Sequence, residues 1–246
     1  MGDIKSSNSF RSVTKELKFE DIIKEISLDG KAMFYHSSPS NFAPKDKKQN
    51  PKINLDFCNG DNKDFGKGFY LSASPEFCNW YFREGGREAN SGIPVNCDHY
   101  YLYQCLVDTA VEKLPNYLNL TNNLKALAKV CYIGRFHCTD KNDLLKDYDA
   151  ILGWMVDDLK FSKIKQILLS RGLIKQDKDR YDYAGNVMVV GLEPDKLTDA
   201  QLEEIGNTIF LNEKDGAYQL AIKNKDIAEN ENYVTLHRPT TEEIRR

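Results

Sequence analysis

The chain has 246 residues, with 34 Lys and Arg against 37 Asp and Glu, which gives a formal net charge of −3 at pH 7. Hydrophobic residues make up 41% and charged residues 29%, a balance that is typical of a globular protein and excludes a disordered chain. Basic and acidic residues are too nearly balanced to indicate a nucleic-acid binder, which we therefore do not expect. No apolar run approaches the roughly 20 residues of a membrane-spanning helix.

Residues 1–18 are polar and lack the apolar segment of a secretory signal, so we expect a cytoplasmic protein, with export by another route left open. The six cysteines include no CxxC pair, which favours free thiols over a disulfide framework. Cys97, His99 and Cys105 have no fourth ligand at zinc-finger spacing, so no metal site is expected.

Hydrophobic periodicity, helix caps and turn residues predict the secondary structure along the chain. In chain order we expect a helix over 19–28, a strand over 32–36, a polar loop over 39–63, a strand over 69–73, a helix from Pro75, a strand over 100–107, a helix from Thr121 to Val130, a strand over 148–156, a helix over 161–172, a strand over 186–192, a helix after the capping box Thr198-x-x-Gln201, and strands over 208–211, 218–222 and 233–236.

This order lacks the steady strand–helix alternation of a doubly wound sheet. It therefore predicts an α+β fold with largely antiparallel strands. We expect residues 1–30 to form a polar leader and an N-terminal helix, and residues 31–246 to form a single domain.

The stretch 64–72, DFGKGFYLS, combines two glycines, a strand and an aromatic ring that could face a flat ligand. It is not a P-loop, because the GxxxxGK[ST] spacing is missing, and it precedes a strand where a dinucleotide-binding GxGxxG motif would open a helix. Taken alone, this stretch predicts a tight turn.

A second stretch, 35–38, ends the first strand in His36, Ser37 and Ser38. A neutral imidazole can hydrogen-bond a ribose hydroxyl through one nitrogen while backbone holds the other nitrogen. The serine hydroxyls suit an amide or a sugar, or simply a turn. Tyr70 and His36 each also have an ordinary alternative as packed core residues.

Asp157 and Asp158 follow a nearly all-apolar strand. Adjacent carboxylates on an extended strand point to opposite sides, so one of them could face a cleft while the other faces solvent.

Taken together, a strand-end histidine, a tyrosine after Gly-Lys-Gly and a later acid are similar to the His-Tyr-acid arrangement of ADP-ribosyltransferases. More specifically, the stretches 35–38, 64–72 and 148–158 resemble a bacterial family of ADP-ribosyltransferase-like domains, the domain of unknown function 3990. The resemblance spans roughly residues 31–175. It implies a split β-sandwich with flanking helices that grips NAD+ between two small sheets.

The resemblance also implies roles for individual residues. His36 would bind a ribose hydroxyl, Tyr70 would stack on nicotinamide, and Asp158, or else Asp157, would stabilise the positive charge that builds as nicotinamide leaves. Ser37, Gly68 and Phe69 would complete the NAD+ site. Many members of the wider superfamily use a glutamate on a later strand as the acid.

The expected function is therefore the transfer of one ADP-ribose group from NAD+ to a macromolecular acceptor, which we take to be a protein. NAD+ is a substrate in this reaction, and no metal is expected. One alternative is an NAD+ glycohydrolase, in which water is the acceptor. Another is a catalytically silent binding module on the same fold. A role as a toxin or effector is inferred only from the kinds of protein with which this family is associated, and not from the residues of this chain.

Overall fold

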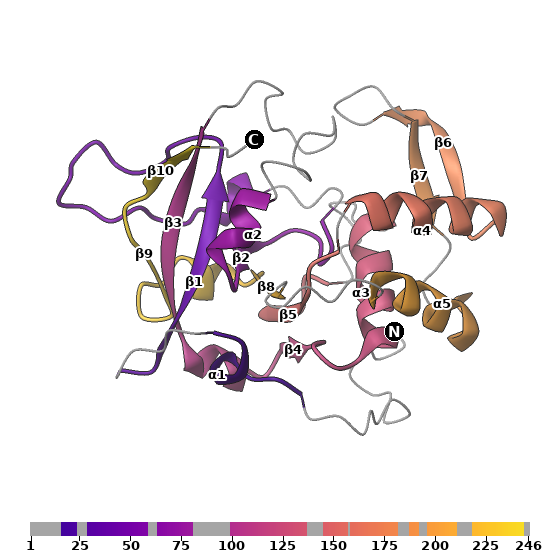
Figure 1. The fold of residues 1–246 in the computed structure, drawn as a ribbon, viewed down its shortest axis with the longest axis horizontal. Helices are drawn as coiled ribbons and strands as arrows, with labels where there is room; N and C mark the ends of the chain where they lie inside the picture. The colour runs from indigo at the N-terminus through magenta and orange to yellow at the C-terminus, as the bar shows by residue number, and fades with distance from the viewer. Residues whose placement is uncertain are drawn as a thin grey trace.

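The computed structural model describes residues 16–23, 29–58, 63–80, 99–136, 145–156, 158–181, 187–191, 196–210 and 218–243. These residues form a mixed α+β structure around a mostly antiparallel sheet, shown in Figure 1. The predicted fold class, α+β with largely antiparallel strands, is confirmed at this level.

The described elements follow the chain in this order: α1 (Phe19–Ile22), β1 (Lys31–Ser38), the 3₁₀ helix η1 (Leu55–Phe57), β2 (Phe69–Ser72), α2 (Pro75–Trp80), β3 (His99–Asp108), the 3₁₀ helix η3 (Thr109–Lys113), β4 (Tyr117–Asn119), α3 (Leu124–Phe136), β5 (Ala150–Trp154), α4 (Asp158–Ser170), β6 (Ile174–Tyr181), β7 (Val187–Gly191), α5 (Asp199–Phe210), β8 (Tyr218–Ile222), α6 (Lys225–Ala228), β9 (Val234–Leu236) and β10 (Thr240–Glu243).

The main sheet has the order β10-β3-β1-β2-β8-β5-β4, with β9 also paired to β3. Only the β4–β5 pair is parallel within this sheet. β1 pairs with β3 along its whole length, but it pairs with β2 at one position, where Tyr35 lies opposite Ser72. The sheet therefore consists of two halves that meet at a single residue pair between β1 and β2.

Two hydrophobic clusters lie on the two sides of β2, β5 and β8, because successive side chains of a strand alternate between its faces. One cluster includes Phe65, Ile151 and Ala221 and packs under α3, α4 and α5. The other includes Phe34, Phe69 and Leu152 and also takes in residues of α1, α6 and β9. In Figure 1, α3, α4 and α5 group with the β6–β7 hairpin at the right, while β1, β3, β9 and β10 lie at the left.

Several local predictions hold in detail. The strand predicted over 218–222 is β8. In the capping box, the backbone N–H of Thr198 donates to the Gln201 side chain, and the Gln201 N–H donates to the Thr198 hydroxyl, before α5 begins. α2 begins at Pro75, as the serine–proline start predicts.

Other predictions were wrong. Residues 208–210, predicted as a strand, form the last turn of α5, because a short apolar run at the end of a helix has no periodicity of its own. The first helix ends at Ile22, where the prediction extended it to 28, since Ile23 is already extended; residues 24–28 lie outside the described residues. Asn123, and not Thr121, accepts a hydrogen bond from the first turn of α3.

The strand that precedes the aspartate pair is also shorter than predicted. β5 ends at Trp154, and Asp158 is the first residue of α4. The expectation that the aspartate pair sits at the end of this strand was therefore wrong for Asp158, which belongs to a helix. An aspartate suits the first turn of a helix, where its charge faces the positive end of the helix dipole.

Candidate functional site

The loop before β2 is held from within by Tyr70. The Tyr70 hydroxyl donates to the Gly66 carbonyl at 2.7 Å and accepts the Phe65 backbone N–H at 2.9 Å. The half-buried ring packs against the α3–α5 cluster and lies parallel to the Phe65 ring, with centroids 6.3 Å apart. The hydroxyl is thus engaged by the loop, so the stacking role expected of Tyr70 would fall to its ring, which packs against Phe65 and the same cluster.

The loop is also held from outside. The Lys223 ammonium donates to the Phe65 carbonyl at 2.8 Å and to the Lys67 carbonyl at 2.6 Å. Gly66 has a φ of 70°, which a residue with a side chain rarely adopts. A Cβ atom on Gly134 of α3 would lie 2.6 Å from the Asp64 carbonyl oxygen, so only glycine lets the helix approach the loop this closely. These contacts show that the loop before β2 is a tight turn, as the stretch 64–72 taken alone predicts.

Asp64 connects this loop to three other parts of the chain. Its Oδ1 accepts Arg135 Nε at 2.8 Å and Arg135 Nη2 at 2.5 Å, and its Oδ2 accepts the Val156 N–H at 3.0 Å and Gln219 Nε2 at 2.6 Å. The side chains of Asp64 and Arg135 are 5% and 6% exposed. Four donors therefore compensate a buried carboxylate, which is what an ionised group needs in a protein interior.

His36 lies where the two halves of the sheet meet. Its Nδ1 is 2.9 Å from the Tyr70 carbonyl oxygen, and its ring stacks on Phe69 with centroids 4.3 Å apart. Because a carbonyl only accepts, Nδ1 carries the proton, and the neutral ring keeps Nε2 as an acceptor. Desolvation lowers the pKa of His36 from 6.5 to about 4, against a raising effect of the Tyr70 carbonyl, so the imidazole is neutral near pH 7.

His36 and Tyr70 are thus brought together, but through backbone. The His36 ring stacks on Phe69, which belongs to one core cluster, while the Tyr70 ring packs against the other cluster. The two side chains lie on opposite sides of β2. A ligand that contacts both must reach them across the junction of β1 and β2.

The other residues predicted at the NAD+ site are mostly engaged in packing. Phe69 is 5% exposed, and Gly68 is buried beside the Ile222 carbonyl of β8. Ser37 lies beside the Cys78 thiol of α2, whose pKa burial raises to about 12. These contacts give each residue a structural role at the junction of β1, β2 and α2.

The structure describes only part of the acid pair. Asp157 lies outside the described residues, and for Asp158 the structure describes the backbone as the start of α4. The chain that leads to it is anchored, because Val156 donates its N–H to Asp64 and accepts from Arg135 Nη2 at 3.2 Å. The segment before Asp158 therefore lies against the loop that carries Tyr70.

Three functional candidates escaped the sequence prediction: Asp64, Arg135 and Gln219. Each has a modest signal in the sequence: an acid before the glycines, a basic residue in the last turn of an amphipathic helix, and a glutamine within an apolar strand. The three residues come from different segments of the chain, so the sequence does not indicate that they contact one another.

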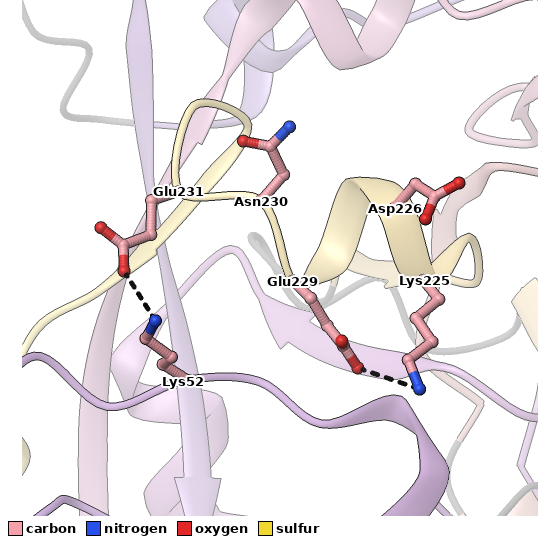
Figure 2. A pocket seen from close by; sticks show the side chains of 6 residues that line it. All are labelled: Lys52, Lys225, Asp226, Glu229, Asn230 and Glu231. Carbon is pink, nitrogen blue, oxygen red and sulfur yellow. Dashed lines mark ion pairs between the residues drawn. The ribbon is translucent and has the colours of Figure 1, made fainter.

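The pocket in Figure 2 lies elsewhere. Its volume is about 570 Å³, and its lining comes from Lys52 and the stretch after β8 and around α6, namely Lys225, Asp226, Glu229, Asn230 and Glu231. Its two lysines are paired with acids: Lys52 with Glu231 at 3.8 Å, and Lys225 with Glu229 at 3.8 Å. None of the predicted site residues lines this pocket, so it does not serve the site at β1 and β2.

Within the described ranges, no group of three or more His, Cys, Asp or Glu side chains could hold a metal ion. Cys97, one of the three residues considered for zinc, lies outside these ranges. Of the helices that the structure describes, none is long and apolar enough to cross a membrane. Cys58, Cys78, Cys105 and Cys131 are free thiols.

The fold and the junction of β1 and β2 thus define a mixed α+β protein with a neutral histidine and a clamped glycine loop at the centre of its sheet. A scan against models of protein families finds none that matches the chain, and a comparison with curated proteins likewise returns no match.

Proposed function

We propose that this protein is a mono-ADP-ribosyltransferase with a split, ADP-ribosyltransferase-like sheet that binds NAD+ at the junction of β1 and β2. The observation that carries the proposal is the state of His36. Its Nδ1–H is held by the Tyr70 carbonyl, so the neutral ring offers Nε2 to a hydroxyl donor such as a ribose.

The arrangement around His36 supports the same site. The sheet halves are paired at one position next to His36, and the loop before Tyr70 is held in one conformation by hydrogen bonds from Tyr70, from Lys223 and from the partners of Asp64. A rigid loop beside a break in a sheet is a suitable place to orient a flat ligand group.

In the proposed reaction, the bond between the nicotinamide nitrogen and the ribose anomeric carbon breaks, and nicotinamide leaves with the bonding electron pair. The acceptor nucleophile forms the new bond to that carbon and loses its proton. Tyr70 is proposed to orient nicotinamide with a ring face, since its hydroxyl is already engaged. Asp158, or Asp157, is proposed to stabilise the positive charge at the anomeric carbon.

The test is cleavage of labelled NAD+ with transfer of ADP-ribose to proteins of a cell lysate. Tyr70→Phe keeps the ring and should retain activity, whereas Tyr70→Leu should lose it. Asp158→Asn should lower turnover by about a hundredfold. Its matched control is Asp199→Asn, because Asp199 is also the first residue of its helix.

Equal labelling by the wild type, Tyr70→Leu and Asp158→Asn would refute the proposal. Release of free ADP-ribose without labelled protein would identify the glycohydrolase alternative, in which water is the acceptor at the same site.

One observation favours the catalytically silent binding module as a second candidate. Many members of the wider superfamily use a glutamate on a later strand as the acid, and the buried polar residue on the later strand β8 is Gln219. An amide cannot supply the negative charge that a developing cation needs. If NAD+ raises the melting temperature without being cleaved, the protein binds the dinucleotide but does not turn it over.

A further inference from the structure

The amide of Gln219 has a defined orientation. Its Nε2 lies 2.6 Å from Asp64 Oδ2 and 3.4 Å from the Trp154 carbonyl oxygen. Both neighbours are acceptors, so the NH₂ group must face them, and Oε1 lies on the other side of the amide. A carboxylate at position 64 thereby selects one of the two amide orientations.

Gln219 belongs to the same side of the sheet as Tyr70. Gln219 lies opposite Ser72 in the β2–β8 ladder, and Ala221 lies opposite Tyr70. Residues opposite one another in a ladder, and residues two apart in a strand, share a face. The fixed acceptor Oε1 is therefore presented on the face to which the Tyr70 ring belongs.

Asp64 holds the rest of this surface as well. Arg135 and Val156 attach it to the end of α3 and to the segment before α4. A buried ion pair is weak evidence for stability, because apolar residues of similar volume often serve as well; fixing one geometry is the role that such pairs can fill.

We propose that Asp64 is a positioning residue for the proposed reaction: on the face of the sheet that carries Tyr70, it fixes the orientation of the Gln219 amide, with Nε2 toward Asp64 and Oε1 turned away from it, and it holds the Tyr70 loop and Val156 in place. This inference rests on the proposed function for its kinetic consequence. Its geometric content, the oriented amide, exists in the protein without NAD+.

The first measurement follows the Gln219 side-chain amide by ¹⁵N NMR in the ligand-free protein, with Gln219→Met to identify its signals. In the wild type we expect slow exchange with solvent and shifts apart from those of exposed glutamines. In Asp64→Asn, one donor must face another donor, so we expect the Gln219 signals to move toward those of exposed glutamines. Arg171→Gln, in an exposed pair with Glu204, is the control and should leave them unchanged.

The second measurement is steady-state cleavage of NAD+. For Asp64→Asn we expect kcat to fall by about a hundredfold while KM changes by less than about threefold, since misplaced groups reduce turnover more than binding. Arg135→Lys keeps the charge of the pair and loses part of the contact to Oδ1. It should show a smaller fall in kcat, and it replaces Asp64→Asn if that variant does not fold.

A folded variant whose Gln219 signals match the wild type would overturn the inference, and so would a folded Asp64→Asn whose kcat stays within about twofold of the wild type. If the wild type cleaves no NAD+, the proposed function fails, and the amide signals still decide whether Asp64 positions Gln219.

Discussion

Two polar side chains lie on opposite sides of β2, the buried Asp64 and the partly buried His36, and their surroundings differ. Asp64 sits on the α3 side as a charged group with four donors around its two oxygens. His36 sits on the other side among Phe42, Phe69 and Tyr103, with a backbone carbonyl on Nδ1. The donors around Asp64 stabilise its negative charge, whereas desolvation of His36 favours the neutral form of its ring.

The difference shows how each side can contribute to a site. A fully coordinated carboxylate is rigid but has no free acceptor for a ligand, so its influence passes through the residues that it holds. A neutral imidazole with one nitrogen engaged still has an acceptor in Nε2. Under the proposed function, His36 contacts the ligand and Asp64 positions other residues, and the following predictions test this division.

The largest expected effect is that of Asp64→Ala. It leaves the Arg135 guanidinium buried without its carboxylate, which should lower the free energy of unfolding by about 3–5 kcal/mol. Urea unfolding measures the change. The double variant Asp64→Leu with Arg135→Met removes both charges and should recover much of the loss; a single-variant loss below about 1 kcal/mol would contradict a buried pair.

The next effect is the pH dependence that His36 introduces. The pKa of His36 is about 4 in the folded protein and 6.5 as the ordinary value, so the unfolded chain binds a proton more readily between these pH values. Stability due to this group is complete above pH 6.5 and declines as the pH falls toward 4, by up to about 3 kcal/mol.

Denaturant unfolding from pH 7 to pH 4 measures this decline in the wild type and in His36→Gln, which can still donate to the Tyr70 carbonyl. The variant should show a flatter profile, and the difference between the two profiles removes the contribution of carboxylates. Parallel profiles would mean that the imidazole titrates normally.

Tyr70→Phe should have a smaller effect. It removes the hydroxyl that satisfies the Gly66 carbonyl and the Phe65 N–H, and it leaves the ring in place. We expect a loss of about 1–3 kcal/mol in the free energy of unfolding, because these backbone groups lose a partner. Hydrogen exchange of the Phe65 amide checks the cause, since it should accelerate only if the loop is released.

The smallest effect should come from Arg171→Ala. Arg171 pairs with Glu204 between the end of α4 and α5, but the two side chains are 50% and 36% exposed. Water screens such a pair, so the expected loss is at most about 1 kcal/mol, and it should shrink in high salt. If Arg171→Ala lowered the free energy of unfolding as much as Asp64→Ala, the expected difference between buried and exposed ion pairs would be contradicted.

The sequence predicted the parts of the fold whose signals are local. An apolar run with clear ends gave the bounds of β8, and a serine–proline pair gave the start of α2. The end of α5 was mistaken for a strand, since three apolar residues fit either structure. The network around Asp64 could not be predicted, because its partners lie 71, 92 and 155 positions away.

By itself, the sequence determined the α+β class and the tight turn before β2 from spacing and residue type, and it made His36 and Tyr70 candidates through a resemblance. Only the tertiary structure decided that the two residues meet through the Tyr70 carbonyl on opposite sides of β2. It also decided that Asp158 begins a helix and that Asp64 is the centre of a buried network. The physical reason is that a side chain's direction and partners depend on strand pairing and burial, which bring together residues that no local pattern links.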